Sequence, residues 1–222
     1  MSIGTVYEKA YKGDFNQVKV KIDEDKSLIA AADTNNRLLI HWAALGGNEN
    51  LVDFLIDLGS PIDPNDDTNC TPLLLASSAG RLEVVRLLIG KGSNVNHKSI
   101  RGQSSLHYAC SKGYIEVAKL LIDADANINE VDILGATPLH RAAAQGRSNI
   151  VELLLASPFI QVDLSDSTGC TALHLACEED REATARMLVQ AEANLNVINK
   201  EKKTPLDVCS NKLKKSLINL TI

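Results

Sequence analysis

Apolar residues recur along this chain at helical spacing, in paired runs that polar turns separate. In the run "LEVVRLLIGKGSNVN", Val84, Leu87 and Leu88 fall on one face of a helix, and "IEVAKLLIDADANIN" repeats this pattern further along. A shorter run rich in small residues precedes each of them, as "CTPLLLASSAG" and "QSSLHYACSKG" do. The pattern predicts pairs of short helices, in which the small residues of the first helix allow close packing.

The helix pairs follow a fixed period. The leucine of "ATPLHRAAAQG" is one of a series whose members lie 33, 33, 33, 34 and 33 residues apart, namely Ile40, Leu73, Leu106, Leu139, Leu173 and Leu206. One extra residue near Pro158 accounts for the longer interval, and a period of this length indicates a repeat array. Seven units fit the chain, at about 1–32, 33–65, 66–98, 99–131, 132–165, 166–198 and 199–222.

We therefore predict an all-α solenoid of seven helix-pair units joined by β-hairpin-like turns. No unit can bury its apolar face alone, so we expect residues 1–222 to form a single domain whose atypical first and last units act as caps. Thr137 followed by Pro138 is typical of a helix start, because the hydroxyl accepts an early backbone N–H and proline needs no donor there. Gly113 and Gly146 fall where a first helix must end.

Composition and charge narrow the class of protein. The 222 residues are 45% apolar but only 4% aromatic, which is typical of a core built on Ala, Leu and Val. The net charge of -5 argues against nucleic acid or an anionic membrane as a partner. The chain shows no signal pattern, no bilayer-length apolar run and no CxxC pair among its five cysteines. We expect a soluble protein with reduced thiols, in the cytoplasm and the nucleus.

Histidine is the first candidate for catalytic chemistry, because four of the five histidines share one repeat position: His41, His107, His140 and His174. A catalytic residue is needed once, so a histidine that recurs in four of the seven units is interpreted as a hydrogen-bonding group of the turn and helix start. Cys170, His174 and Cys177 could be zinc ligands, but no fourth ligand is evident. "GKGS" lacks the first glycine and the Ser or Thr of a phosphate loop. We predict no enzyme activity, no metal and no cofactor.

The recurring T-P-L-H-x-A pattern, present as "TPLHRA" from Thr137, resembles the ankyrin repeat over nearly the whole chain. This resemblance implies protein binding along a concave face made of turn tips and first helices, with specificity from residues that vary between units. The alternative for each such residue is a solvated polar side chain without a partner. We expect the protein-binding residues to be Arg37, Trp42, Asp66, Asp67, Tyr108, Lys112, Arg141, Gln145, Glu178, Glu179 and Asp180.

Charge is unevenly distributed along the repeats. Residues 199–222 carry six lysines and two acidic residues, a net charge of +4, which leaves -9 on the rest of the chain because the total is -5. An acidic concave face favours a basic protein partner, chiefly through association rate and orientation. Lys112, Gln145 and Glu179 share one repeat position, so we expect their side chains to line up across adjacent units.

Further stretches are similar to the gankyrin family of proteasome-associated ankyrin-repeat proteins. They include "IHWA" from Ile40, "LHLACEED" from Leu173 and "NKEKKTPL" from Asn199. This resemblance implies a monomeric, non-enzymatic chaperone for assembly of the proteasome regulatory particle. Such a chaperone holds the C-terminal domain of one regulatory ATPase subunit.

The gankyrin resemblance also implies charged contacts with the partner at Arg37, Asp67, Lys112 and Glu179. The chain departs from the family pattern at three positions in the early repeats. An acidic residue is common in the family where this chain has an asparagine, and an aromatic residue and a histidine are replaced in the third unit; the positions are Asn35, Cys70 and Leu74.

The same resemblance implies two other partners. A retinoblastoma-type pocket protein would bind an LxCxE motif, which Leu175, Cys177 and Glu179 satisfy. Such motifs bind in an extended form, whereas we expect these residues to lie within a helix with Cys177 buried, so that local opening would have to come first. A cyclin-dependent kinase would bind the early repeats. A cell-cycle regulator that binds a kinase without a proteasome role is therefore the alternative to the assembly chaperone.

Overall fold

The computed structural model describes residues 3–220, which fold into paired short helices. The elements are α1 (Ile3–Lys12), α2 (Phe15–Glu24), the 3-10 helix η1 (Lys26–Ile29), α3 (Leu39–Gly46), α4 (Glu49–Asp57), α5 (Pro72–Ser78), α6 (Leu82–Gly90), α7 (Ser105–Lys112), α8 (Ile115–Asp123), α9 (Pro138–Ala144), α10 (Ser148–Leu155), α11 (Ala172–Glu178), α12 (Glu182–Gln190), α13 (Pro205–Val208) and α14 (Asn211–Ile218). Each predicted unit contains one pair, so the seven helix pairs are confirmed. None of these helices is long and apolar enough to cross a membrane.

The chain divides into two compact units. Unit 1 runs to Ser105 and includes residues 123–126, and unit 2 comprises residues 106–122 and the chain from Asn127 onward. Unit 1 contains α1 to α6, and unit 2 contains α9 to α14 with nearly all of α7 and α8.

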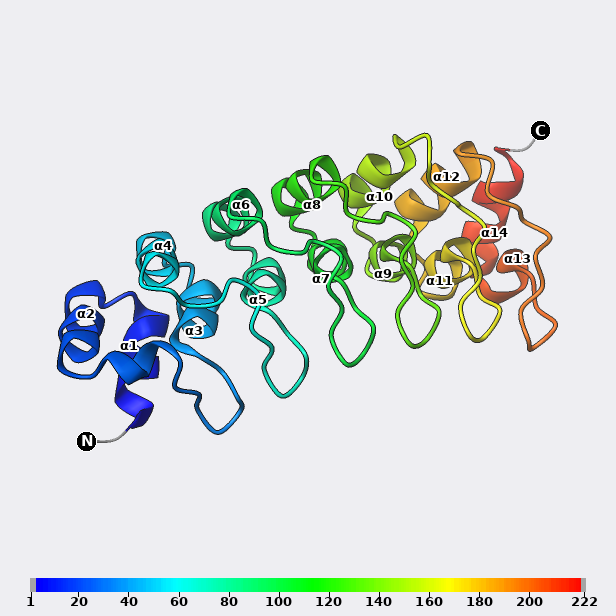
Figure 1. Ribbon diagram of the computed structural model, residues 1–222. Coiled ribbons are helices and arrows are strands. Elements are labelled where there is room, and N and C mark those ends of the chain that lie inside the picture. The colour runs from blue at the N-terminus through cyan, green and yellow to red at the C-terminus, as the bar shows by residue number, and fades with distance from the viewer. Residues whose placement is uncertain (1–2, 221–222) are drawn as a thin grey trace. The chain divides into compact units, whose positions relative to one another are not determined.

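Within each unit the first helices of successive repeats pack in one row and the second helices in another (Figure 1). In unit 1, α1 packs against α3 and α3 against α5, while α4 packs against α6. In unit 2, α9 packs against α11 and α11 against α13, while α10 and α12 continue the second row to α14. Each repeat thus buries its apolar face against its neighbours, as the periodicity predicts.

The turns before the first helices are hairpin-like without forming regular strands in residues 3–220. Isolated antiparallel bridges join Lys98 to Ser104 and Ser165 to Thr171. Successive turns within a unit share one backbone hydrogen bond, from Ile100 N–H to the Thr68 carbonyl in unit 1 (2.9 Å) and from Ser167 N–H to the Leu134 carbonyl in unit 2 (2.7 Å). These bonds hold the turns of adjacent repeats side by side.

Helix starts and ends follow the predicted residues. Thr137 Oγ1 accepts a hydrogen bond from the His140 N–H at 3.3 Å, and Pro138 occupies the first turn of α9. Gly146, beyond the end of α9, has φ of 63°, in the left-handed region that favours glycine.

Three arginines link consecutive repeats through hydrogen bonds that were not predicted from the sequence. Arg81, Arg147 and Arg181 each precede a second helix, at the N-cap position. Each donates from Nε to a backbone carbonyl near the end of the preceding repeat's first helix: Leu45 (3.1 Å), Ser111 (3.3 Å) and Ala144 (3.2 Å). These bonds satisfy carbonyls that lack a partner inside their own helix.

The core of unit 2 is built from leucines and small residues. Leu139 is 1% exposed, and Ala142, Ala143 and Ala176 are fully buried between the packed first helices. Removal of a buried leucine side chain leaves a cavity that this close packing of backbones cannot refill.

We expect Leu139→Ala to lower the free energy of unfolding by about 2–5 kcal/mol, because it deletes buried apolar contacts and opens a cavity. The matched control is Leu134→Ala in the same repeat, where the side chain is 52% exposed; it should cost less than about 0.5 kcal/mol. Urea unfolding followed by circular dichroism measures both. Equal losses in the two variants would contradict the burial argument.

Candidate protein-binding face

The repeat histidines are structural, as predicted. His41, His107, His140 and His174 are at most 1% exposed. In three of the repeats the ring Nδ1 accepts the backbone N–H of the residue that starts the helix: Leu38 (3.0 Å), Thr137 (3.1 Å) and Thr171 (3.1 Å). Because Nδ1 is an acceptor, the ring is neutral and carries its proton on Nε2.

The other ring nitrogen reaches into the next repeat. Nε2 lies at hydrogen-bond distance from the carbonyls of Cys70 (3.2 Å), Ala136 (3.0 Å), Cys170 (3.0 Å) and Lys203 (3.2 Å), for the four histidines in chain order. The imidazoles of His41, His140 and His174 thus cap their own turns and also donate to the turn of the neighbouring repeat. Burial lowers the pKa of His41, His107 and His140, although the carbonyl acceptors partly oppose this shift.

Cys170, His174 and Cys177 do not form a metal-binding arrangement. Both ring nitrogens of His174 are engaged with backbone groups. Cys177 is fully buried in α11, and burial raises the pKa of its thiol, which disfavours the thiolate that a metal needs. Among residues 3–220 no group of three His, Cys, Asp or Glu side chains could hold a metal ion.

Asp66 is buried, although the sequence predicted it on the exposed binding face. It is 5% exposed, and its Oδ1 accepts the backbone N–H groups of Thr68 (2.8 Å) and Cys70 (2.9 Å). Arg37 Nε donates to its Oδ2 at 2.9 Å. Burial alone raises the pKa of Asp66, but these hydrogen bonds outweigh it and hold the pKa below the usual value. The carboxylate is therefore used inside the turn.

The same contact recurs at equivalent positions, which is the signal that the sequence analysis missed for Asp66. Asp33, Asp132, Asp166 and Asn199 each accept the N–H groups two and four residues further on, at 2.8 to 3.1 Å. A polar residue that recurs once per unit belongs to the turn, by the argument that holds for the histidines.

In unit 1, the other expected binding residues are accessible to different degrees. Asp67 is exposed at the tip of its turn, whereas Arg37 and Trp42 are half-buried. The Arg37 guanidinium lies 5.2 Å from the centroid of the Trp42 ring, in cation–π contact, in addition to its ion pair with Asp66. Asp67 is thus the expected charged residue of unit 1 that has no ion-pair partner among the described residues.

In unit 2, Lys112, Gln145 and Glu179 are all exposed, at the last residue of α7 and directly after α9 and α11. The last two follow helices that pack side by side, so the shared repeat position places them in one row. Glu178 and Asp180 are exposed beside Glu179.

The two remaining candidates of unit 2 are less free. Tyr108 is half-buried, and Arg141 pairs with Asp132, the aspartate of its own turn, with Nε 3.1 Å from Oδ2. We define the first-helix face by the exposed members of the expected set in unit 2, which are Lys112, Gln145, Glu178, Glu179 and Asp180; Asp67 is a separate exposed residue of unit 1.

The LxCxE residues lie in α11 and at its end, as expected. Cys177 is fully buried, Leu175 is half-buried, and only Glu179 is exposed. An extended-binding partner would have to unwind α11 and expose Cys177, which packs within the core of the repeat.

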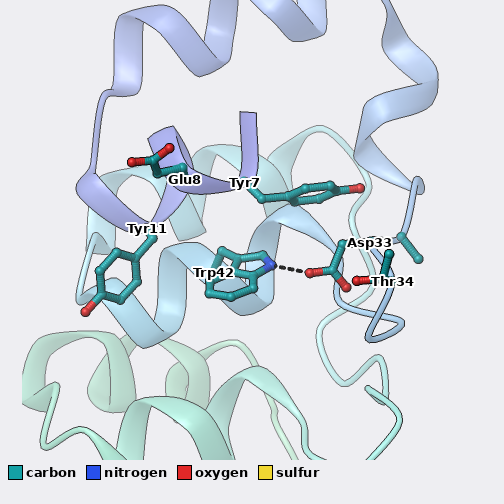
Figure 2. Close-up of a pocket in the computed structure, with 7 residues that line it drawn as sticks. Tyr7, Glu8, Tyr11, Asp33, Thr34 and Trp42 are labelled. Atoms are coloured by element: carbon teal, nitrogen blue, oxygen red, sulfur yellow. Dashed lines mark hydrogen bonds between the residues drawn. The ribbon is translucent and has the colours of Figure 1, made fainter. Parts of the chain in front are cut away.

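A cleft of about 590 Å³ lies in the first two repeats, lined by Tyr7, Glu8, Tyr11, Ala32, Asp33, Thr34 and Trp42 (Figure 2). Trp42 Nε1 donates to Asp33 Oδ2 at 2.9 Å, and the Tyr11 ring meets the indole edge-on, with centroids 6.3 Å apart. We call this the aromatic cleft. Sequence reasoning found Trp42 but not the tyrosines, because the first unit lacks the repeat signature by which positions can be aligned.

The comparisons with known proteins agree on the repeat type. The profile of the family described as "Ankyrin repeats (3 copies)" matches residues 8–99 and 91–166, and that of the single "Ankyrin repeat" matches residues 168–200. Together these matches cover most of the chain and confirm the ankyrin-repeat resemblance.

Among curated proteins, this chain is similar to the 26S proteasome non-ATPase regulatory subunit 10 of mouse, rat and human. Each is 41% identical over 63 residues, which is 28% of this chain. The matched stretch spans only 27% of the mouse and rat proteins and 28% of the human protein. The similarity to a proteasome-associated ankyrin protein, expected from the sequence, is confirmed over that stretch.

Two solved structures show the same fold. The human ASB11 ankyrin repeat domain matches with a TM-score of 0.89 at 24% identity, over 99% of this chain and 97% of that one. The ankyrin repeat domain of Bcl-3 matches with a TM-score of 0.82 at 22% identity, over 96% and 97% of the two chains. At this identity the likeness concerns the all-helical ankyrin-repeat solenoid fold alone.

Histidine burial predicts that the protein loses stability on acidification. The unfolded chain takes up protons near pH 6.5, whereas burial keeps His41, His107 and His140 neutral in the fold to lower pH. Below about pH 6.5 the free energy of unfolding should therefore fall, by up to about 1.4 kcal/mol per pH unit for each histidine. Urea titrations between about pH 7.5 and about pH 5.5 measure the slope. Stability that stays level or rises on acidification in that window would contradict the assignment.

The adjacent residues Asp66 and Asp67 provide a second test, which asks which of the two side chains the fold requires. Asp66→Ala should lower the free energy of unfolding by about 2–4 kcal/mol, because it leaves the partly buried Arg37 and two turn N–H groups without an acceptor. Asp67→Ala removes an exposed side chain of the same type and should change it by less than about 0.5 kcal/mol. Thermal or urea unfolding of both variants decides whether Asp66 or Asp67 is the structural residue.

Proposed function

This chain belongs to the ankyrin-repeat family, and from that premise we propose that it is a non-enzymatic scaffold that binds another protein on its first-helix face. The observation that carries the proposal is the row of exposed, non-equivalent side chains at one repeat position. Lysine, glutamine and glutamate occupy that position in three successive repeats, at Lys112, Gln145 and Glu179. Residues required by the fold recur, whereas this row varies and makes few internal contacts.

Exposure and contacts support the same division. The recurring histidines have their polar atoms engaged within the repeats, and the turn aspartates Asp66 and Asp132 are also paired with Arg37 and Arg141, so these groups are unavailable to a partner. Among the described residues, the one ion-pair partner of Glu179 is Arg181, at a long distance of 3.6 Å between two exposed side chains. A pair of that kind is worth little and is easily exchanged for a contact with a partner.

The curated relatives and the acidic residues of the first-helix face support one class of partner. We infer a role in assembly of the proteasome regulatory particle, in which this chain holds the C-terminal domain of a regulatory ATPase subunit. The name of the curated relatives, a non-ATPase regulatory subunit of the 26S proteasome, supports this role. The acidic cluster formed by Glu178, Glu179 and Asp180 favours a basic surface on the partner, and this attraction raises the association rate.

Charge reversal at one exposed acidic residue of the expected set in each unit tests the proposal. Asp67→Lys and Glu179→Lys should each weaken binding to the cognate ATPase C-terminal domain by about tenfold at ~0.15 M salt, because an attraction becomes a repulsion. Calorimetric titration of the purified chain against the C-terminal domains of the regulatory ATPases measures the affinity. The free energy of unfolding should change by less than about 0.5 kcal/mol, since both side chains are exposed.

The matched control for this experiment is Glu116→Lys, in the second helix α8. Glu116 is exposed, and its one ion-pair partner in residues 3–220 is Lys119 of the same helix, at 3.0 Å. Its reversal makes the same change in net charge away from the first-helix face and should leave affinity within about twofold. Affinity purification from cells should recover regulatory ATPases. Recovery of a cyclin-dependent kinase and its cyclin without any ATPase would overturn the proteasome role.

A further inference from the structure

We propose that the aromatic cleft binds the side chain of one lysine in a basic segment of the protein partner. This inference rests on the proposed protein-binding function and adds a recognition site to it, in the first two repeats. Three features support it: the aromatic walls of the cleft, the negative charge of its lining, and one unused acceptor position on the Asp33 carboxylate.

The walls of the cleft are aromatic and held in place. The Trp42 indole is fixed by its hydrogen bond to Asp33 (Figure 2). The Tyr7 hydroxyl donates to the Ala31 carbonyl at 3.0 Å. Tyr11 is 42% exposed and stands edge-on to the indole, so its ring can cover a ligand without displacing the core. Aromatic rings in this arrangement attract cations and pack against the methylene stem of a lysine.

The lining of the cleft is negative. Its charged residues are Glu8 and Asp33, and no basic side chain of the described part of the chain contributes to it. Glu8 is paired with Lys12, which is exposed on the same helix. Arg37 lies against the Trp42 ring but outside the lining of the cleft, and it is paired with Asp66. Among the described residues, no lysine or arginine lies within ion-pair distance of the Asp33 carboxylate. The cleft therefore offers one carboxylate that a cation from outside can neutralise.

The acceptor geometry selects an ammonium group. Asp33 Oδ1 already accepts the N–H groups of Asn35 (2.8 Å) and Arg37 (2.9 Å), and Oδ2 accepts the Trp42 indole N–H. This leaves a single acceptor position, on Oδ2. A lysine ammonium is a point charge that a single acceptor can serve, whereas a guanidinium prefers two parallel acceptors.

The sequence provides its own reporter, because Trp42 is the only tryptophan in the chain. The probe is the peptide acetyl-Gly-Lys-Gly-Lys-Gly-amide, titrated into full-length protein labelled with nitrogen-15, and the readout is the single indole N–H signal. The lysine peptide should shift this signal in a saturable manner. The same peptide with glutamine in place of lysine should not, and an equal response to both peptides would overturn the proposal.

Two variants locate the response. Tyr11→Ala removes an exposed aromatic wall and Asp33→Asn removes the unpaired charge, and each should weaken the lysine response at least about fivefold. Glu116→Gln is the matched control, since it neutralises an exposed helical carboxylate in unit 2, and it should leave the response unchanged. A lysine response that survives both Tyr11→Ala and Asp33→Asn would place the binding elsewhere and overturn the proposal. A backbone amide spectrum of each variant verifies that the repeats remain folded.

This titration is separate from the test of the proposed function. It uses a peptide and no ATPase, so a failure to bind ATPase leaves the lysine response intact and removes only the proteasome role. Conversely, ATPase binding without any lysine response would remove the cleft as a lysine site and leave the first-helix face as the binding surface.

Discussion

The structure depends on one interaction between neighbours, the hydrogen bond from a buried, neutral imidazole to the backbone carbonyl of the next repeat. The same ring accepts a backbone N–H from its own helix start, so both nitrogens are committed in repeats such as those of His140 and His174. Buried polar groups are costly unless they are paired, and here one side chain satisfies two turns. An imidazole held in this way cannot act as a base, an acid or a metal ligand.

Other recurring polar side chains are likewise hydrogen-bonded to backbone groups. A turn aspartate accepts two backbone N–H groups in most repeats, and the arginines before the second helices reach back to carbonyls of the preceding repeat. These contacts engage most of the charges that recur with the period of the chain. What remains exposed is the set of side chains that differ from one repeat to the next, and such residues are available for recognition without a cost to the fold.

The two candidate surfaces use this freedom differently. The first-helix face presents flexible, exposed charges such as Lys112 and Glu179, which suit steering and orientation of a charged partner. The aromatic cleft presents rigid rings around a carboxylate, which suit the capture of one side chain. The cleft arises where the atypical first repeat meets the second, since α1 supplies tyrosines and α3 supplies Trp42.

The sequence by itself determined the repeat period, the seven helix pairs, the structural role of the histidines and the burial of Cys177, because these follow from local periodicity. Recurrence of a polar residue at the position of Asp66 indicated a role in the turn, but it did not show the contacts of this side chain, and the adjacent, exposed Asp67 is of the same chemical type. Only the tertiary structure decided between them, since Asp66 accepts hydrogen bonds from the Arg37 side chain and from backbone N–H groups of its own turn. The aromatic cleft likewise required the structure, because Tyr7, Tyr11 and Trp42 come from two helices whose packing brings the rings together.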